Sequence, residues 1–265
     1  FGFNYLSMNT SIDIIKEKLA DADPLDGLKT ITGLFPGKVV FSTSFGIEDQ
    51  VIADMIYSAG LPVTVFTLDT GRLFQETYDV MDYTRSKYKA EILTYSPDTE
   101  SLQNLINTKG PNSFYLSVDN RKECCRIRKI EPLKRALKGM DVWITGLRAE
   151  QSGHRASMNH LEWDEGNSII KYHPILSWNI DDVKRYIAEK KVPYNVLHDK
   201  GFPSIGCAPC TRAVLAGEDF RAGRWWWEAS HKECGLHAST NSASASTNSA
   251  SASTNSASAS TEKVK

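Results

Sequence analysis

The chain has 265 residues, with 31 lysines and arginines against 32 aspartates and glutamates, so its formal net charge is −1. This balance excludes the strongly basic surface that drives non-specific binding to nucleic acid, and we expect no nucleic-acid partner. No run of about 18 apolar residues is present, so we expect no membrane span.

The sequence predicts strands that alternate with helices along most of its length. A helix over residues 11–19 comes first, because Ser11 is a favourable N-cap and apolar residues recur after it at helical spacing. The strands expected next are apolar runs bounded by turn residues, at 38–44, 62–68, 90–95 and 141–146. The helices expected with them cover 48–60, 74–88, 100–108 and 124–138. This alternation predicts an α/β fold with a mostly parallel twisted sheet and helices on both faces.

The C-terminal residues differ in composition from the rest. Residues 239–261 contain only Ser, Thr, Asn and Ala and repeat STNSASA three times. Such a segment has nothing larger than Asn to bury, so we expect a disordered tail over 239–265. The preceding residues, 1–238, are enough for a single domain.

Three loops follow predicted strands, where ligands collect in parallel α/β folds. In STSFGIED (42–49), the hydroxyls of Ser42, Thr43 and Ser44 and the N–H groups of the next helix suit a phosphate or sulfate. The alternative is an ordinary turn in which a serine caps the helix. The loop has neither the dinucleotide glycine pattern nor the Gly-Lys-Ser/Thr of a P-loop.

The other two loops carry charged side chains. Asp69 can accept hydrogen bonds from a ribose or adenine, and Arg72 can bind a phosphate, although a solvated pair around a glycine turn is the alternative. In TGLRAEQSGHR (145–155), Arg148 and Arg155 favour anion recognition over surface solvation.

The cysteines form two pairs and one single residue. Cys124 and Cys125 are adjacent at a predicted helix start, and Cys207 and Cys210 have C-x-x-C spacing. Four thiolates suit either tetrahedral zinc or an iron–sulfur cluster, and basic residues around the first pair favour the cluster. A redox C-x-x-C beside two core cysteines is a further alternative. Five cysteines are too few for a disulfide scaffold and indicate a reducing, cytoplasmic location.

The single cysteine, Cys234, lies in KECGLH (232–237), downstream of Arg221 and Arg224. Cationic surroundings lower the pKa of a thiol and make it more reactive. We therefore interpret Cys234 as a candidate nucleophile, with a buried structural thiol as the alternative.

Together, in this order, the motifs resemble those of one family. They are STSFGIEDQV, LDTGRLFQET, CCRIRKIEPL, ITGLRAEQSGHR, GFPSIGCAPCT, GRWWWE and KECGLH. Over about residues 38–237 the chain is similar to assimilatory adenylylsulfate (APS) reductases of the phosphoadenylylsulfate (PAPS) reductase family. The resemblance implies an adenine nucleotide α-hydrolase-like fold of the PP-loop type.

The resemblance also implies a reaction and its cofactor. A 4Fe–4S cluster on Cys124, Cys125, Cys207 and Cys210 is expected in preference to zinc. Cys234 is expected to attack the sulfur of APS, expel AMP and carry an S-sulfocysteine, from which thioredoxin or a glutaredoxin-like dithiol releases sulfite. Both steps require a mobile C-terminal segment, expected from about residue 221.

The substrate contacts implied by the motifs and loops cover both ends of the nucleotide. The expected residues are Ser42, Ser44, Gly46, Asp49, Asp69, Arg72, Lys129, Arg148, Arg155, Arg221, Arg224 and His237. The cations among them suit the negative charge on the sulfate and phosphate oxygens.

Several alternatives stay open at this point. The enzyme could use PAPS or both substrates, because the cluster cysteines do not decide the group at the ribose 3′ position. A tRNA-thiolating PP-loop enzyme is more distant, since such enzymes use an S-G-G-x-D-S loop and Phe45 stands in the loop here. A non-catalytic nucleotide-binding module with zinc is the third class. A homo-oligomer is compatible with the sequence.

Overall fold

A six-stranded sheet forms the centre of the computed structural model, which describes residues 5–19, 22–152 and 155–228. Its strand order is β3-β2-β1-β4-β6-β5, and every neighbouring pair is parallel except β5 and β6. The strands are β1 (Val39–Ser42), β2 (Thr64–Leu68), β3 (Leu93–Tyr95), β4 (Val142–Ile144), β5 (Leu161–Asp164) and β6 (Ile169–Tyr172). The predicted mostly parallel sheet is confirmed; the antiparallel β5–β6 hairpin is an addition to it.

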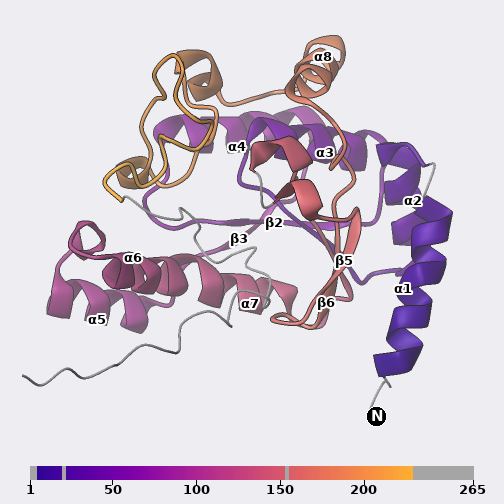
Figure 1. Cartoon of the computed structure of the whole chain (residues 1–265), viewed down its shortest axis with the longest axis horizontal. Coiled ribbons are helices and arrows are strands. Elements are labelled where there is room, and N and C mark those ends of the chain that lie inside the picture. The colour runs from indigo at the N-terminus through magenta and orange to yellow at the C-terminus, as the bar shows by residue number, and fades with distance from the viewer. Residues whose placement is uncertain (1–4, 20–21, 153–154, 229–265) are drawn as a thin grey trace, which may run out of the picture.

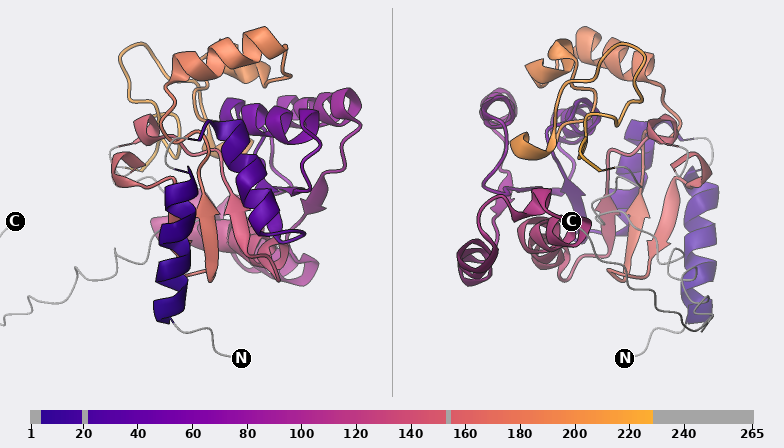
Figure 2. Two further views of the ribbon diagram at one scale, coloured as in Figure 1. Left: turned by 90° about the vertical axis from the view of Figure 1, so that its right-hand side faces the viewer. Right: turned by 60° about the vertical axis from the view of Figure 1, so that its left-hand side comes forward.

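Helices cover both faces of the sheet. Figure 1 shows α3 and α4 on one face and α6 and α7 on the other, and Figure 2 shows the same layers from two further sides. The helices are α1 (Tyr5–Leu19), α2 (Pro24–Leu34), α3 (Ile47–Ser58), α4 (Gln75–Tyr88), α5 (Thr99–Lys109), α6 (Val118–Cys125), α7 (Glu131–Leu137) and α8 (Ile180–Lys190). None of them, in the part of the chain described, is long and apolar enough to cross a membrane.

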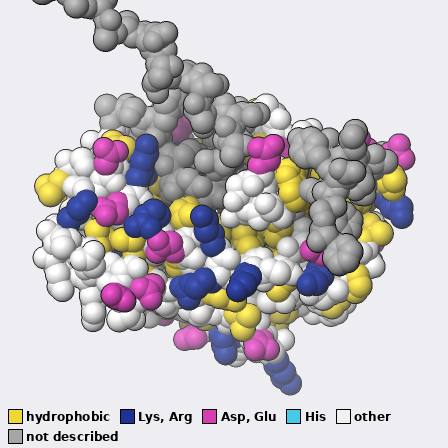
Figure 3. All heavy atoms as spheres, turned by 90° about the horizontal axis from the view of Figure 1, so that it is seen from below, with side chains coloured by type: hydrophobic (Ala, Val, Ile, Leu, Met, Phe, Trp, Pro, Cys, Tyr) yellow, Lys and Arg dark blue, Asp and Glu magenta, His cyan; other side chains and the backbone are white. Residues whose placement is uncertain are grey.

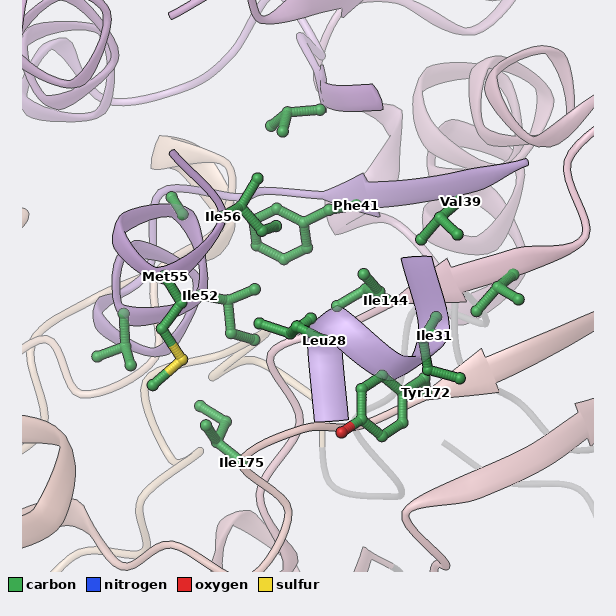
Figure 4. Close-up of a cluster of buried hydrophobic side chains, with 14 of the residues drawn as sticks. Leu28, Ile31, Val39, Phe41, Ile52, Met55, Ile56, Ile144, Tyr172 and Ile175 are labelled. Carbon is green, nitrogen blue, oxygen red and sulfur yellow. The ribbon is translucent and has the colours of Figure 1, made fainter. Parts of the chain in front are cut away.

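Alternation along β1 explains how one strand serves two cores. Val39 and Phe41 belong to the larger cluster, whereas Val40 packs with α7 residues on the opposite face. In the larger cluster, Leu28 of α2 and Ile52 of α3 lie against Phe41, as Figure 4 shows. Helix α3 therefore packs against the sheet, α2 and α8, and its first turn follows the end of β1.

The predicted helix over 124–138 differs from the structure. Helix α6 begins at Val118, where the Ser117 side chain accepts a hydrogen bond from Asn120 N. Residues 126–130 form a π-helical turn before α7 begins. The two adjacent cysteines thus lie at the end of α6 and not at a helix start, and the irregular turn follows them directly.

The molecular surface on the side of α5 and α7 carries both signs of charge. Figure 3 shows lysine and arginine side chains interspersed with aspartate and glutamate there. Among the described residues visible on this face, the two signs of charge are therefore mixed.

Candidate active site

A cleft of about 220 Å³ opens at the carboxyl ends of β1, β2 and β4. The loops that follow these three strands form one side of it, and residues from His198 to Trp225 form the other. Of the residues predicted to bind substrate, the cleft is lined by Ser42, Ser44, Gly46, Asp49, Lys129, Arg155, Arg221 and Arg224. Three strands and a distant segment therefore bring together residues almost 200 positions apart.

The loop after β1 is held by a buried carboxylate. Asp49 Oδ2 accepts hydrogen bonds from Ser44 N at 2.6 Å and from Ser44 Oγ at 2.7 Å. Burial raises the pKa of Asp49 to about 6, although these hydrogen bonds act in the opposite direction. The hydroxyl hydrogen of Ser44 is thereby committed to Asp49 and does not point at a bound anion.

Phe45 gives this loop its shape. Its φ is 59°, in the left-handed region, and its side chain is buried. The hydroxyl of Thr43 accepts a hydrogen bond from Phe45 N at 3.0 Å. A bulky residue is strained in this conformation, so core packing and the Thr43 contact must hold it there beside the cleft.

Among the described residues, Lys129, Arg155, Arg221 and Arg224 are the cations that line the cleft, and Arg155 and Arg224 are closely packed. Arg155 is 8% exposed and donates to Gln151 Oε1. Arg224 donates to Ser204 Oγ and Ile205 O, both at 3.3 Å. A Cβ at Gly206 would lie 2.3 Å from Arg224 Nη2, so only glycine allows this approach. Preorganised cations of this kind stabilise the anionic groups of a ligand.

Three predicted substrate residues do not line the cleft. Arg148 is 1% exposed and pairs at 3.0 Å with Glu48, which lines the cleft. Asp69 accepts hydrogen bonds from Gly71 N at 2.8 Å and from Tyr78 Oη at 2.9 Å. These contacts assign both side chains to the support of their loops.

Arg72, the third of them, lies beside the cysteines. Its guanidinium stacks over the ring of Phe114 at 5.1 Å and donates to Asn112 Oδ1 at 3.3 Å. It lines a second, smaller cavity of about 20 Å³ next to the cleft. That cavity is lined by all four paired cysteines, Cys124, Cys125, Cys207 and Cys210.

The environment of the four thiols is buried and cationic. Burial acts to raise the pKa of Cys207, but the charge of Lys129, a contact with Thr70 at 3.2 Å and two arginines outweigh it and lower this pKa. Burial raises the pKa of Cys210 to about 12, and neighbouring Cys207 adds to the effect. Adjacent buried thiols therefore do not all ionise unless positive charge is supplied among them.

The donor set fits an iron–sulfur cluster. In the described ranges, no three His, Cys, Asp or Glu side chains converge as ligands of one ion. A four-iron cluster is larger than one ion and its thiolate ligands stand further apart. Four cysteines around one cavity, with Arg128 and Lys129 on the same wall, provide the ligands and the compensating charge.

The predicted nucleophile lies outside the described residues, as do His237 and the tail from 239. The last residue described is Glu228, which is buried and accepts a hydrogen bond from Arg121 Nε at 2.6 Å. Trp225 packs under this pair and against the cysteines. The described part of the C-terminal segment is therefore packed onto the cysteine cavity, six residues before Cys234. Mobility of the segment stays a prediction.

Several cleft residues carried no recognisable sequence signal. His198 Nε2 accepts a hydrogen bond from Ile47 N, the first residue of α3, at 3.2 Å. Burial lowers the pKa of His198, which keeps the ring neutral and able to accept. Thr145 lies within the third loop motif but was not predicted to bind substrate, although it lines the cleft.

The parallel sheet, the cleft at its carboxyl edge and the adjoining cysteine cavity define a nucleotide-binding α/β protein with a thiol-ligand site. Residues 38–213 match the phosphoadenosine phosphosulfate reductase domain, and the chain belongs to this family. The resemblance found in the motifs is confirmed.

Relatives and a solved structure agree with this assignment. An adenosine 5′-phosphosulfate reductase of Allochromatium vinosum is 50% identical over 200 residues, covering 75% of this chain and 78% of the relative. One of Agrobacterium fabrum is 46% identical over 236 residues, covering 88% and 90%. The crystal structure of a PAPS reductase from Candida auris, in a phosphate complex, has a TM-score of 0.67 at 30% identity and covers 81% and 99%.

Proposed function

We propose that this protein reduces adenylylsulfate to sulfite and AMP in sulfate assimilation. One observation carries the proposal: Lys129, Arg224 and Trp225 line both the cleft and the cysteine cavity. The anion end of a bound nucleotide would therefore lie beside the cysteines. The relatives named adenosine 5′-phosphosulfate reductase, at 44–50% identity, support this choice of substrate.

The first step forms one bond and breaks one. The thiolate of Cys234 attacks the sulfur of APS, an S–S bond forms, and the bond between sulfur and the phosphate oxygen breaks with its electron pair on AMP. The enzyme then carries a thiosulfonate, Cys–S–SO₃⁻. In the second step a dithiol of the thioredoxin class is oxidised to a disulfide, and sulfite and the free Cys234 thiol are released.

The cations of the cleft have a defined task in the first step. Negative charge on the AMP phosphate grows as the S–O bond breaks. Lys129, Arg155 and Arg224 are fixed in or beside the cleft before the reaction, so they stabilise this charge without reorganising.

A 4Fe–4S cluster is the cofactor that we propose for the second cavity. Cys124, Cys125, Cys207 and Cys210 would hold it. When bound, the cluster supplies the iron charge that keeps four neighbouring thiolates ionised. Lys129 contributes the protein's own positive charge to both this site and the cleft.

Trapping the covalent intermediate tests the proposal. Anaerobically purified full-length protein is incubated with APS in the absence of a reductant, and AMP release and intact mass are measured. We expect one AMP per chain and a mass increase of one SO₃ group on the peptide that contains Cys234. Cys234→Ser should show neither. An adduct on Cys207 or Cys210, or AMP release by Cys234→Ser, would contradict the mechanism.

A further inference from the structure

Thr145 follows β4 and faces His173 across the sheet. The parallel register of β4 and β6 pairs Ile144 with Tyr172, so the next residues on each strand are also neighbours. The hydroxyl oxygen of Thr145 lies 2.6 Å from His173 Nδ1. Thr145 also lines the cleft, whereas His173 is fully buried behind it.

Glu162 determines which ring nitrogen of His173 carries the proton. Its Oε2 lies 3.7 Å from His173 Nε2, which makes no hydrogen bond within the part of the chain described. Burial lowers the pKa of His173, so the ring is neutral and has one N–H. A proton on Nε2 points at a carboxylate, and a lone pair there would be repelled by it. Nε2–H is therefore the favoured tautomer, and Nδ1 is an acceptor.

The tautomer fixes the direction of the Thr145 hydroxyl. With Nδ1 as acceptor, Thr145 Oγ1 donates its only hydrogen to His173. Its oxygen then has only lone pairs to offer a ligand in the cleft. The hydroxyl of Ser42 instead accepts a hydrogen bond, because Trp143 Nε1 can only donate and does so to Ser42 Oγ at 2.8 Å. Ser42 thus keeps a hydrogen to donate.

A second acceptor lies against Gly146, the residue after Thr145. A Cβ on Gly146 would lie 2.2 Å from Asp49 Oδ1 and 3.3 Å from Asp49 N. Gly146 therefore lies against the first turn of α3, next to the loop that suits an anion, and Thr145 directly precedes it and lines the same cleft as Asp49. We call Thr145 and Asp49 the acceptor corner. The cations of the cleft come from other elements.

Adenylylsulfate has few groups that match the acceptor corner. Its phosphosulfate oxygens are all acceptors, so only the ribose hydroxyls and the adenine amino group can donate. The ribose is one methylene from the 5′-phosphate, and the base is further away. A corner that adjoins the anion loop therefore meets the ribose.

We propose that Thr145 is a specificity-determining residue, which accepts a hydrogen bond from the ribose 3′-hydroxyl. This inference rests on the proposed function. His173 and Glu162 are the positioning residues of Thr145. APS and PAPS differ only at this position, and the relatives at 44–50% identity are named for APS. A 3′-phosphate has no hydrogen-bond donor for Thr145 Oγ1 and is repelled by Asp49, so the corner selects the hydroxyl.

Binding of nucleotide products tests this without turnover. Calorimetry with the anaerobically purified full-length protein compares AMP, 2′-deoxy-AMP, 3′-deoxy-AMP and adenosine 3′,5′-bisphosphate. Thr145→Val should lower the affinity for AMP and for 2′-deoxy-AMP about three- to tenfold, which is the contribution of one neutral hydrogen bond. The affinity for 3′-deoxy-AMP should be unchanged. The substitution should also narrow the preference for AMP over the bisphosphate. Thr145→Ser should retain wild-type affinities.

Two controls separate positioning from stability. Thr32→Val removes a buried threonine hydroxyl in α2, away from the cleft, and should leave every affinity unchanged. His173→Leu alone should weaken the binding of AMP, but it should have no further effect on that binding when Thr145→Val is already present. His173→Asn should bind AMP more tightly than His173→Leu, because the amide can still accept a hydrogen bond from Thr145. An additive effect of His173→Leu would assign it a structural role.

The possible results distinguish a failure of the Thr145 inference from a failure of the proposed function. If the wild type forms sulfite from APS and binds AMP, yet Thr145→Val weakens all four nucleotides equally or none, the inference alone is overturned. If Thr145→Val left the affinity for 2′-deoxy-AMP or for IMP unchanged, in place of that for 3′-deoxy-AMP, Thr145 would contact a different group of the nucleotide. That result would also overturn the inference. A wild type that binds no AMP would overturn both.

Discussion

Asp49 is a buried charge with a cost to the fold. It is 9% exposed, and the first turn of α3 and the Ser44 loop surround it. Ser44 donates to its Oδ2 through both the backbone and the hydroxyl. Because burial outweighs these contacts, the pKa of Asp49 is raised to about 6. Ionised Asp49 thus destabilises the folded state relative to its protonated form.

Replacing Asp49 should reveal this cost as a pH effect. An acid whose pKa is raised on folding lowers stability as pH increases from its ordinary value, near 4, to its folded value, near 6. A shift of about two units corresponds to about 3 kcal/mol. The free energy of unfolding of Asp49→Asn, minus that of the wild type, should therefore increase by about this amount between pH 4 and 6.5 in urea titrations.

Asp98 provides a control of opposite sign. Hydrogen bonds from Ser101 lower the pKa of this exposed N-cap of α5. Asp98→Asn should lose stability relative to the wild type as pH rises towards the ordinary aspartate pKa near 4, and the difference should then stay constant between pH 4 and 6.5. Parallel pH curves for wild type and Asp49→Asn would show that the carboxylate is not titrating as described.

At the scale of elements, α6 joins the cysteine cavity to the C-terminal segment. Arg121 of α6 is 1% exposed, stacks over the ring of Trp225 at 4.6 Å and pairs with Glu228. Trp225 adopts a φ of 42°, a strained conformation for a bulky residue that the surrounding packing maintains. This buried pair fixes the point from which the chain continues towards Cys234.

Breaking that pair should destabilise the protein. Glu228→Gln leaves the Arg121 guanidinium buried without its carboxylate, which costs about 3 kcal/mol in comparable cases. Glu131→Gln breaks an exposed Arg–Glu pair with Arg126 and should cost less than about 1 kcal/mol. Denaturant unfolding measures both variants, and equal effects would contradict the structural role of Glu228.

The cysteine cavity also connects two elements. Cys124 and Cys125 end α6, and Cys207 and Cys210 flank a short turn more than 80 residues later. Cys207→Ser should lose iron and acid-labile sulfide and lower the melting temperature, because the cluster no longer joins these elements. Cys234→Ser should retain wild-type iron content while losing sulfite formation. Full iron content in Cys207→Ser would contradict the proposed ligand set.

At the scale of the whole molecule, local patterns predicted the sheet but not the contacts across it. Apolar runs alternating with helical periods predicted β1 to β4 and a mostly parallel sheet, but not β5, β6 or the order of the strands, and strand ends located the cleft. The Thr145–His173 contact depends on the register of β4 and β6, which no local pattern contains. His198 reaches Ile47 across 151 positions for the same reason. The start of α6 could have been found, since Ser117 is a recognisable N-cap.

The sequence also did not show which charged residues support a loop and which contact a ligand. Arg148 and Arg155 are alike in sequence, within one arginine-containing loop. Only the buried carboxylate of Glu48, from a different element, shows that Arg148 supports the fold while Arg155 lines the cleft. Charge in a motif predicts an anion site but not which cation faces it.

Sulfite release from APS and from PAPS measures which nucleotide the enzyme reduces. The assay uses anaerobically purified full-length protein, thioredoxin as the dithiol, and equal concentrations of either nucleotide. We expect stoichiometric sulfite and AMP from APS, a dependence on thioredoxin, and a kcat/KM for PAPS at least about tenfold lower, a barrier difference of about 1.4 kcal/mol. No sulfite from APS, or a preference for PAPS, would contradict the proposed function.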